Sequence, residues 1–422
     1  MVIELQLKIK DWIKENRARG ARLLQKLVQE NSTRENESKA QAIIIEKCRR
    51  LGMSLDIWEI GDEELLHHPS YHCDRKDFKG NPNVVGVLRG AGGGKSIILN
   101  GHVDVVPVGD YEQWSQDPFS GHIEAGKLYG RGSTDMKGGT VALLMAIEAL
   151  TALDIKLKGD IIFQSVIEEE SGGAGTLAAV LRGYKADGAI IPEPTNMKIF
   201  PIQQGSMWFR ITVKGRSAHG GTRYEGVSAI EKAMLVIEKL RVLERRRNNA
   251  INDPLFDKIP IPINIGKFSS GEWPSSVPDI AIIEGRMGVS PDETMAAAEK
   301  ELENELKFLE VEDTWFIDNP LQIEWFGGRW LPGSVERDHP LLKVLEESYV
   351  IVKQEEPLLE ASPWGTDGGI LSRVGKTPVI VFGPGVTSTA HETDEYIILE
   401  DLFEASEIIA LTIARWCEVA SD

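Results

Sequence analysis

The sequence predicts an α/β protein in which a domain with a mixed, mostly parallel sheet is interrupted by a small inserted α+β domain. Strands and helices alternate over 54–191, which is typical of an α/β domain. From residue 207 the order becomes β-α-β-β-α-β, and the first pattern then returns near the C-terminus. We therefore expect one domain over 1–206 and 331–422 and a second domain over 207–330.

The larger predicted domain combines amphipathic helices with short apolar strands. Apolar residues recur at helical spacing over 4–29, and the run 96–99, Ser-Ile-Ile-Leu, is apolar after its first residue. Short continuous runs of this kind fit strands that are buried on both faces. The expected helices are 4–29, 36–52, 140–150, 174–182, 339–353 and 400–418, and the expected strands are 54–60, 83–89, 95–100, 159–167, 187–191 and 377–382.

The inserted stretch has the element order of a ferredoxin-like domain. Its expected strands are 207–215, 261–268, 277–287 and 321–326, and its expected helices are 225–243 and 292–308. The segment 61–82 of the larger domain is polar and irregular and contains His67, His68, His72 and Cys73. Their spacing matches no common zinc motif, so we expect an ordinary loop there.

Composition excludes several classes of partner. The chain has 422 residues, is 42% hydrophobic and carries a formal net charge of −18, which argues against nucleic acid and anionic membranes as partners. Solubility alone also accounts for this charge. Three widely spaced cysteines predict no disulfide framework and favour a reducing cytoplasm. The sequence shows no signal-peptide core at its start and no uncharged apolar run of about 18 residues, so we expect a cytoplasmic protein without a membrane span.

Five imidazole and carboxylate side chains can be assembled into a two-metal hydrolytic site. His102 follows the predicted strand 96–99, and Asp104 could hold its second ring nitrogen. Asp135 lies in a glycine-rich turn before a helix, where a helix cap is the alternative. The other candidates are the carboxylate run 168–170 at the end of the next strand, Glu193 between two prolines and His391 in a Gly/Pro-rich loop.

A two-metal site needs one group that bridges the ions. A carboxylate can bridge because each oxygen binds one metal, which makes Asp135 the natural candidate. Zinc accepts such nitrogen and oxygen ligands, and two ions about 3.5–4 Å apart can share a water and polarise a substrate carbonyl. A general base must then move the water's proton to the leaving nitrogen. Within 168–170, neighbouring carboxylates can face different sides, but spacing alone does not assign their roles.

The chain resembles the M20 metallopeptidase family over 83–193 and again over 365–395. That family includes acetylornithine deacetylase, succinyl-diaminopimelate desuccinylase, aminoacylase and glutamate carboxypeptidases. The matching phrases occur in the family's order: Gly101-His102-Val103-Asp104-Val105-Val106-Pro107, then Asp117-Pro118-Phe119, Leu128-Tyr129-Gly130-Arg131-Gly132-Ser133-Thr134-Asp135-Met136-Lys137-Gly138-Gly139, Glu169-Glu170-Ser171-Gly172, Glu193-Pro194-Thr195 and Ala390-His391.

The resemblance implies a dinuclear-metal catalytic domain and an inserted lid domain that forms a homodimer. It implies two Zn²⁺ ions per chain, with Co²⁺ as the alternative metal. By motif, His102 and Glu193 would bind one ion, Glu170 and His391 the other, and Asp135 would bridge them. Glu169 matches the general base and Asp104 the carboxylate behind the first imidazole. In the lid, His219 matches the histidine that stabilises the oxyanion in the partner's active site, although it could also be an ordinary loop histidine.

The lid departs from the family pattern where substrate is contacted. Ser275 stands where the family often has an asparagine, and Gly288 stands at the usual arginine position. Arg286 lies two residues earlier on the same strand face and is the alternative contact for a substrate carboxylate, unless it forms a structural ion pair. Gly365, in Gly365-Thr366-Asp367-Gly368, resembles another loop near the substrate. These changes put the usual amino-acid carboxylate pocket in doubt.

We therefore expect a metal-dependent hydrolase that removes an acyl group from a small N-acylated amine or amino acid, in the manner of acetylornithine deacetylase. A metal-bridging hydroxide would attack the amide carbonyl, with Glu169 as the general base. The alternatives are a dipeptidase or carboxypeptidase of the same family, an N-formylaminopyrimidine deformylase, and an inactive binding or scaffold protein. Because all five ligands and the base are present, an enzyme is favoured over the scaffold.

Overall fold

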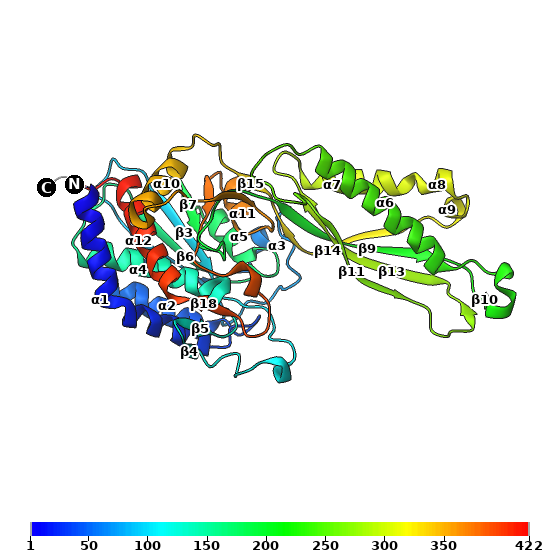
Figure 1. Ribbon diagram of the computed structural model, residues 1–422, viewed down its shortest axis with the longest axis horizontal. Helices are drawn as coiled ribbons and strands as arrows, with labels where there is room; N and C mark the ends of the chain where they lie inside the picture. The colour runs from blue at the N-terminus through cyan, green and yellow to red at the C-terminus, as the bar shows by residue number, and fades with distance from the viewer. Residues whose placement is uncertain (1, 421–422) are drawn as a thin grey trace. The chain divides into compact units, whose positions relative to one another are not determined.

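The computed structural model describes residues 2–420. The chain divides into two compact units, and Figure 1 labels most of their helices and strands. The first unit comprises Met1–Gln203, Gly333–Ser362 and Thr366–Asp422, and the second comprises Gln204–Pro332 and Pro363–Gly365. Among residues 2–420, no helix is long and apolar enough to cross a membrane.

The first unit is organised around a nine-stranded mixed sheet with a parallel centre. The central strands lie in the order β6 (Ile161–Val166), β3 (Ile97–His102), β7 (Ala189–Ile191) and β17 (Val379–Val381). Strands β3 and β6 are buried along their whole length, as expected for parallel strands covered on both faces. The predicted α/β class with a mixed, mostly parallel sheet is confirmed.

Further strands extend both edges of this sheet. On one side, β2 (Pro82–Leu88) pairs antiparallel with β6 and β1 (Ser54–Glu59) pairs with β2. On the other side, β8 (Ile199–Gln203) joins β17 and pairs with β15 (Gly333–Ser334) and β16 (Leu359–Ser362). A separate small sheet contains β18 (Tyr396–Ile398), β5 (Lys127–Tyr129) and β4 (Ile123–Glu124).

The helices of the first unit cover the sheet. Helix α4 (Gly138–Ala152) packs against α1 (Val2–Gln29) and α12 (Leu399–Trp416), and α10 (Pro340–Lys353) packs against α12. Twelve of the fifteen residues of α4 are buried, because the helix lies between its helical neighbours and strand β3. The remaining helices are α2 (Ser38–Arg50), α3 (Glu63–Leu66), α5 (Ala174–Leu181) and α11 (Gly368–Arg373).

A glycine lets α4 approach the segment that carries Glu193. A Cβ added to Gly139 would lie 1.9 Å from the Pro192 carbonyl oxygen, closer than real Cβ atoms come to any neighbour. Residue 139 therefore has to lack a side chain for the helix to begin beside the end of β7. The double glycine 138–139 in the sequence has this packing role.

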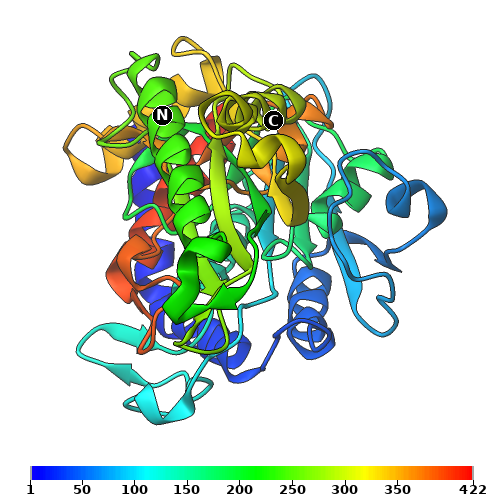
Figure 2. The ribbon, with the colours of Figure 1, turned by 90° about the vertical axis from the view of Figure 1, so that its right-hand side faces the viewer.

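The second unit is a four-stranded antiparallel sheet with helices α6 (Ala229–Asn249) and α7 (Met295–Lys307) on one face, as both ribbon views show (Figures 1 and 2). The strand order is β11 (Ile263–Ser270), β13 (Ile280–Val289), β9 (Gly205–Lys214) and β14 (Gln322–Trp330). With the chain order β9-α6-β11-β13-α7-β14, this topology confirms the predicted ferredoxin-like insertion. The unit also contains β10 (Ala218–His219), β12 (Ser276–Val277), α8 (Leu309–Glu312) and α9 (Trp315–Asp318).

Alternation along β9 explains the core of the second unit. Met207, Phe209, Ile211 and Val213 are fully buried and belong to one cluster with residues of α6 and α7. The intervening residues of the strand are less buried, as the period of two requires. Burying each large apolar side chain stabilises the unit by roughly 1.5–3 kcal/mol.

The expected domain bounds differ from the two units by two or three residues at 204–206 and 331–332, and also at Pro363–Gly365. We expected 331–422 to belong to the larger domain, but these three residues cluster with the second unit. The reason is a close approach: a Cβ on Gly365 would lie 2.4 Å from Cβ of Trp330. That the two units act as catalytic domain and lid stays a prediction.

Candidate metal centre

The candidate metal ligands lie at the ends of the central strands of the first unit. His102 is the last residue of β3, the 168–170 run follows β6, and Glu193 follows β7. Asp135 lies in the short helical turn η2 (Ser133–Lys137), and His391 lies between η4 (Thr387–Thr389) and β18. Parallel strands present these ends at one edge of the sheet, which is where α/β folds collect polar groups.

Asp135 lies between two imidazoles. Its Oδ1 is 3.3 Å from Nε2 of His102, and its Oδ2 is 3.4 Å from Nε2 of His391. Each oxygen therefore faces a different histidine, which is the arrangement that a bridging carboxylate requires. Glu170 Oε2 lies 3.1 Å from His391 Nε2, and Glu193 Oε1 lies 3.8 Å from His102 Nε2.

The structure brings all five predicted ligands and Glu169 together. Glu169 Oε2 lies 3.9 Å from His102 Nε2. Ligand atoms of His102, Asp135 and Glu170 lie within 4.8 Å of one another, and so do those of His102, Glu169 and Glu193. Apart from the adjacent Glu169 and Glu170, these side chains come from separate segments of the sequence.

The contact between His102 and Asp104 differs from our expectation. The His102 Nδ1–H donates to the backbone carbonyl of Asp104 at 2.8 Å, whereas the nearer carboxylate oxygen lies 3.6 Å away. The other carboxylate oxygen of Asp104 accepts a hydrogen bond from the backbone N–H of Glu170 at 3.1 Å. The carbonyl thus sets the tautomer of His102, and the Asp104 carboxylate holds the turn that carries Glu170.

The donor set fits a pair of divalent cations. His102 Nε2 is buried and has no hydrogen-bond partner within the described part of the chain, and the same holds for Oε1 of Glu170. With Nδ1 as the donor, the Nε2 lone pair points at carboxylate oxygens, which would repel it in the absence of a cation. Imidazole and carboxylate ligands of this kind suit zinc and related divalent metals.

The electrostatics of the cluster show the same need for positive charge. Burial raises the pKa of Glu169 well above its ordinary value; His102 opposes this shift, and Glu193 adds to it. Burial alone would also raise the pKa of Asp135, but its contacts with His102 and His391 outweigh burial and lower it. The contacts with Asp135 and Glu170 raise the pKa of His391 to about 11.

A buried ion pair that the sequence analysis missed supports the His391 loop. Arg131 Nη1 lies 2.6 Å from Glu395 Oε2, and both side chains are almost fully buried. Arg131 also donates to the backbone carbonyl of His391, while Glu395 accepts from the backbone N–H groups of Thr134 and Asp135. The pair therefore ties the loop of one candidate ligand to the turn of another. Arg131 lies within a quoted motif and Glu395 lies at the end of the second stretch of resemblance, but nothing local marks them as partners.

Two further buried charges adjoin the cluster. Asp367 follows the Gly365 loop, and its Oδ2 accepts a hydrogen bond from Thr176 Oγ1 at 2.7 Å, which in turn accepts from Asn100. Lys137 Nζ donates to the backbone carbonyls of Leu27, in the last turn of α1, and of Glu30, just beyond that helix. Burial raises the pKa of Asp367 to about 6 and lowers the pKa of Lys137 to about 7.

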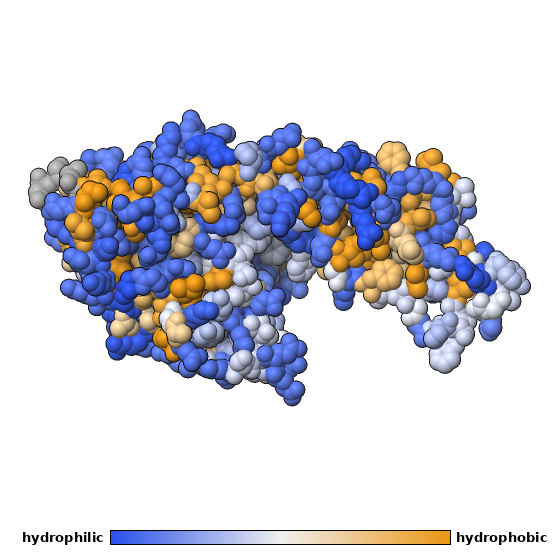
Figure 3. Space-filling view, viewed as in Figure 1, coloured by the Kyte–Doolittle hydropathy of each residue, from blue (hydrophilic) through white to orange (hydrophobic). Residues whose placement is uncertain are grey.

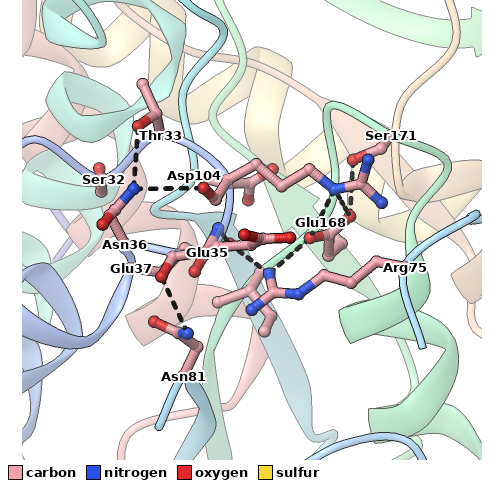
Figure 4. A network of polar contacts seen from close by, with 12 residues as sticks. Ser32, Thr33, Glu35, Asn36, Glu37, Arg75, Asn81, Asp104, Glu168 and Ser171 are labelled. Carbon is pink, nitrogen blue, oxygen red and sulfur yellow. Dashed lines mark hydrogen bonds and ion pairs between the residues drawn. The ribbon is translucent and has the colours of Figure 1, made fainter. Parts of the chain in front are cut away.

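Glu168 lies beside the cluster but points into a different network, drawn in Figure 4. Its side chain is fully buried and pairs with Arg75 at 2.6 Å. Arg75 belongs to the segment 61–82, which is mostly loop, as expected, apart from the short helix α3. The histidines of this segment join no metal-ligand group among residues 2–420.

The remaining predicted site residues belong to the second unit. His219 is exposed, and its Nδ1 accepts from the backbone N–H of Gly221, which leaves Nε2 as the ring nitrogen that can donate. Ser275 is exposed, and its carbonyl accepts from Gly220 N–H. Arg286 is partly buried and, among the described residues, forms no ion pair; burial lowers its pKa to about 10. The structural ion pair that we gave as its alternative role is therefore absent from the described residues.

Comparison with known proteins identifies the family. The model of peptidase family M20/M25/M40 matches residues 98–415, and the chain belongs to this family. It is a metal-dependent amidohydrolase, as the sequence predicted.

Two curated relatives show how far the similarity extends. An N-formyl-4-amino-5-aminomethyl-2-methylpyrimidine deformylase of Bacillus subtilis is 34% identical over 402 residues, covering 90% of each chain. A probable succinyl-diaminopimelate desuccinylase of Staphylococcus epidermidis is 26% identical over 354 residues, covering 78% of this chain and 85% of the relative.

Solved structures share the fold. A Staphylococcus aureus tripeptidase superimposes with a TM-score of 0.74 at 22% identity, covering 95% of this chain and 99% of the tripeptidase. A dinuclear metal-binding M20 peptidase of Bacillus subtilis superimposes with a TM-score of 0.65 at 17% identity, covering 96% and 99% of the two chains.

Proposed function

We propose that this enzyme removes the formyl group from an N-formylated aminopyrimidine. The observation that carries the proposal is the similarity to a deformylase along nine-tenths of both chains. The replacement of the family's asparagine by Ser275 supports it, because a pyrimidine substrate has no α-carboxylate to be recognised. This was one of the alternatives from the sequence, and it now replaces acetylornithine deacetylation as our leading hypothesis.

The roles of the metal ligands are part of the proposal. His102 and Glu193 would hold one ion, Glu170 and His391 the other, and Asp135 both, because its two oxygens face different imidazoles. When bound, the ions polarise the substrate carbonyl and acidify a water molecule. We propose Zn²⁺ as the native metal, with Co²⁺ as a functional substitute.

Glu169 would move the proton that the reaction requires. Burial and neighbouring carboxylates raise the pKa of Glu169, so in this environment it readily accepts a proton. It takes the proton from water and delivers it to the amide nitrogen as the C–N bond breaks. The products of hydrolysis are formate and the free amine.

We assign substrate contacts to four residues of the second unit, which are His219, Ser275, Arg286 and Gly365. His219 Nε2–H is a donor suited to the developing oxyanion, since its Nδ1 is already an acceptor. Ser275 offers a hydroxyl to polar groups of the substrate, and Arg286 offers a guanidinium that forms no ion pair with any residue of 2–420. Gly365 permits close backbone packing at Trp330.

We also propose that the second unit forms a homodimer interface and that the protein acts in the cytoplasm. Figure 3 shows apolar residues at the surface over the helices of this unit. Helix α6 exposes Met234 (63%) and Leu235 (41%), and extended exposed apolar patches often mark surfaces where proteins associate. Sedimentation of Met234→Glu beside the parent protein tests the interface: a dimer in both samples contradicts it. The three cysteines are buried and free, which suits a reducing compartment.

A substrate panel tests the proposed activity. Zinc-loaded protein is incubated with N-formyl aminopyrimidines, N-acetyl and N-succinyl amino acids and dipeptides, and amine release is measured. Glu169→Gln, which keeps the shape of the side chain, is the control. Turnover of the formyl substrates alone, lost in the control, supports the proposal, whereas turnover of another class with no formyl activity refutes it.

One observation favours a second candidate, the removal of an acyl group from an amino acid. Arg286 has no ion-pair partner among the described residues, and a guanidinium in this state is suited to a substrate carboxylate. Deacylation of N-acetyl or N-succinyl amino acids, or cleavage of dipeptides, would use that contact. Arg286→Met distinguishes the candidates, because it should raise KM far more for carboxylate substrates, which lose an ion pair, than for a formylpyrimidine, which loses at most a hydrogen bond.

A further inference from the structure

We infer that Arg75 and Glu168 are positioning residues that aim Glu169 and Glu170 at the metal centre. The three consecutive glutamates 168–170 point in different directions. Glu169 approaches His102, Glu170 approaches His391, and Glu168 points away from both toward Arg75. Hydrogen bonds at both ends of the run hold the three side chains in these directions.

The backbone at Glu168 has an unusual conformation. Its φ of 62° lies in the left-handed region, which glutamate rarely adopts. The turn after it is closed by Gly173 N–H donating to the Glu168 carbonyl at 2.8 Å and by Gly172 N–H donating to the Glu169 carbonyl at 3.0 Å. Because the turn is this short, a change of backbone angle at Glu168 would redirect both of the next side chains.

The Glu168 carboxylate is held by donors on both oxygens (Figure 4). Oε1 accepts from Arg75 Nη1 at 2.6 Å, and Oε2 accepts from Ser171 Oγ at 2.7 Å and from Cys73 Sγ at 3.1 Å. Arg34 Nε lies 3.1 Å from Oε2. A buried carboxylate with this many donors has one stable position, and its Cα is fixed with it.

Arg75 is itself immobilised. Its Nη1 also donates to Glu37 Oε1 at 2.7 Å, and its Nε donates to the Asp77 carbonyl at 2.8 Å. Its guanidinium lies over the Phe78 ring, 4.8 Å from the centroid. The Arg75 side chain is only 3% exposed, and the Glu37 side chain is fully buried. The bond from Arg75 therefore comes from a rigid anchor.

A second anchor acts at the other end of the glutamate run. The backbone N–H of Glu170 donates to the carboxylate of Asp104, and the backbone carbonyl of Asp104 orients His102. With Glu168 held from one side and Glu170 N–H from the other, Glu169 has little backbone freedom. This inference rests on the proposed roles of Glu169 and Glu170, and it assigns a purpose to an otherwise unexplained buried arginine in a loop.

The test compares Arg75→Met, Arg75→Lys and Glu168→Gln with the parent protein. For each folded, metal-loaded variant, kcat and KM are measured on the active substrate, and the affinity for Co²⁺ is measured separately by titration of its absorption. We expect Arg75→Met to lower kcat, Co²⁺ affinity or both by about 10–100-fold with little change in KM. Arg75→Lys, which keeps the charge, should recover part of the loss.

Lys47→Met is the matched control, because it breaks a largely buried ion pair of the same unit, Lys47–Glu148 at 2.5 Å, away from the glutamate run. It should reduce stability without changing kcat or Co²⁺ affinity. If Arg75→Met does not fold, Glu168→Gln decides the matter, because it leaves Arg75 paired with Glu37. If the folded variants keep the parental kcat and Co²⁺ affinity, this inference is wrong and the proposed function is unaffected. Full turnover by Glu169→Gln would overturn it together with the proposed function.

Discussion

The Arg131–Glu395 pair allows the dependence of the metal centre on its buried support to be measured. Replacing Arg131 by Met removes a guanidinium from a 2.6 Å contact between two side chains that are 3% and 0% exposed. Breaking a buried pair from one side costs about 3–5 kcal/mol, because the remaining carboxylate is left without a counter-charge. That is a large fraction of the roughly 5–15 kcal/mol that stabilises a folded protein.

The loss should also reach the candidate ligand His391. Arg131 donates to the backbone carbonyls of His391 and Glu392, so its removal frees the loop that carries this imidazole. We therefore expect Arg131→Met to lower the affinity for the ion assigned to His391 and Glu170 more than the affinity for the ion assigned to His102 and Glu193. Zinc titration of the folded variant, followed by competition with a chromophoric chelator, measures the two affinities.

A double-mutant cycle separates the charge effect from lost packing. Burial raises the pKa of Glu395 to about 7, with Arg131 opposing the shift, so an unpaired Glu395 is the destabilising element. Adding Glu395→Gln to Arg131→Met should therefore restore part of the free energy of unfolding, measured by urea denaturation. If Arg131→Met alone costs less than about 1 kcal/mol, or if Glu395→Gln gives no recovery, the reasoning is wrong.

Three other predictions concern pH, metal and packing. Burial and the nearby Glu404 raise the pKa of Asp401 to about 6 from an ordinary value of 3.8, so the folded state binds more protons between these values and stability falls as pH rises through that window. The full shift corresponds to about 3 kcal/mol, which solvent screening reduces to about 1–1.5 kcal/mol. Asp401→Asn should therefore be more stable than the parent protein at pH 7.5 but not at pH 4. An equal difference in stability at both pH values contradicts this prediction. Removing metal with a chelator should lower the urea midpoint, and free zinc at about 100 times its Kd should restore about 2.7 kcal/mol; identical midpoints with and without zinc would count against the metal centre. Gly139→Ala should lower stability by about 1–3 kcal/mol, since its Cβ would lie 1.9 Å from the Pro192 carbonyl oxygen, and unchanged thermal unfolding would show that α4 can shift.

Local patterns predicted most of the elements. Periodicity and apolar runs located the central strands and the long helices within a few residues, because each pattern reports burial of its own segment. Short edge strands such as β15 (Gly333–Ser334) and β16 (Leu359–Ser362) were missed. A strand of two to four residues is too short to show a period of two, and each of these strands pairs with β8, which lies far away in the sequence.

The candidate site was predicted unevenly. Motifs named the five candidate ligands and Glu169, which the structure brings together, whereas their roles stay our proposal. The expected carboxylate contact of Asp104 with His102 was replaced by a carbonyl contact, because the short step from residue 102 to 104 places the backbone nearer to Nδ1. That Arg286 would lack an ion pair in the described part of the chain could not be read from its neighbours in sequence.

By itself, the sequence determined the class of fold, the family and the residue types available for the chemistry, because these depend on repeating local patterns and ordered motifs. Only the tertiary structure decided which charges meet. Arg131 and Glu395 are 264 residues apart, and Arg75 and Glu168 are 93 apart. No local pattern encodes such a pair, because its stability comes from shared burial and excluded water, which exist only once the chain has folded.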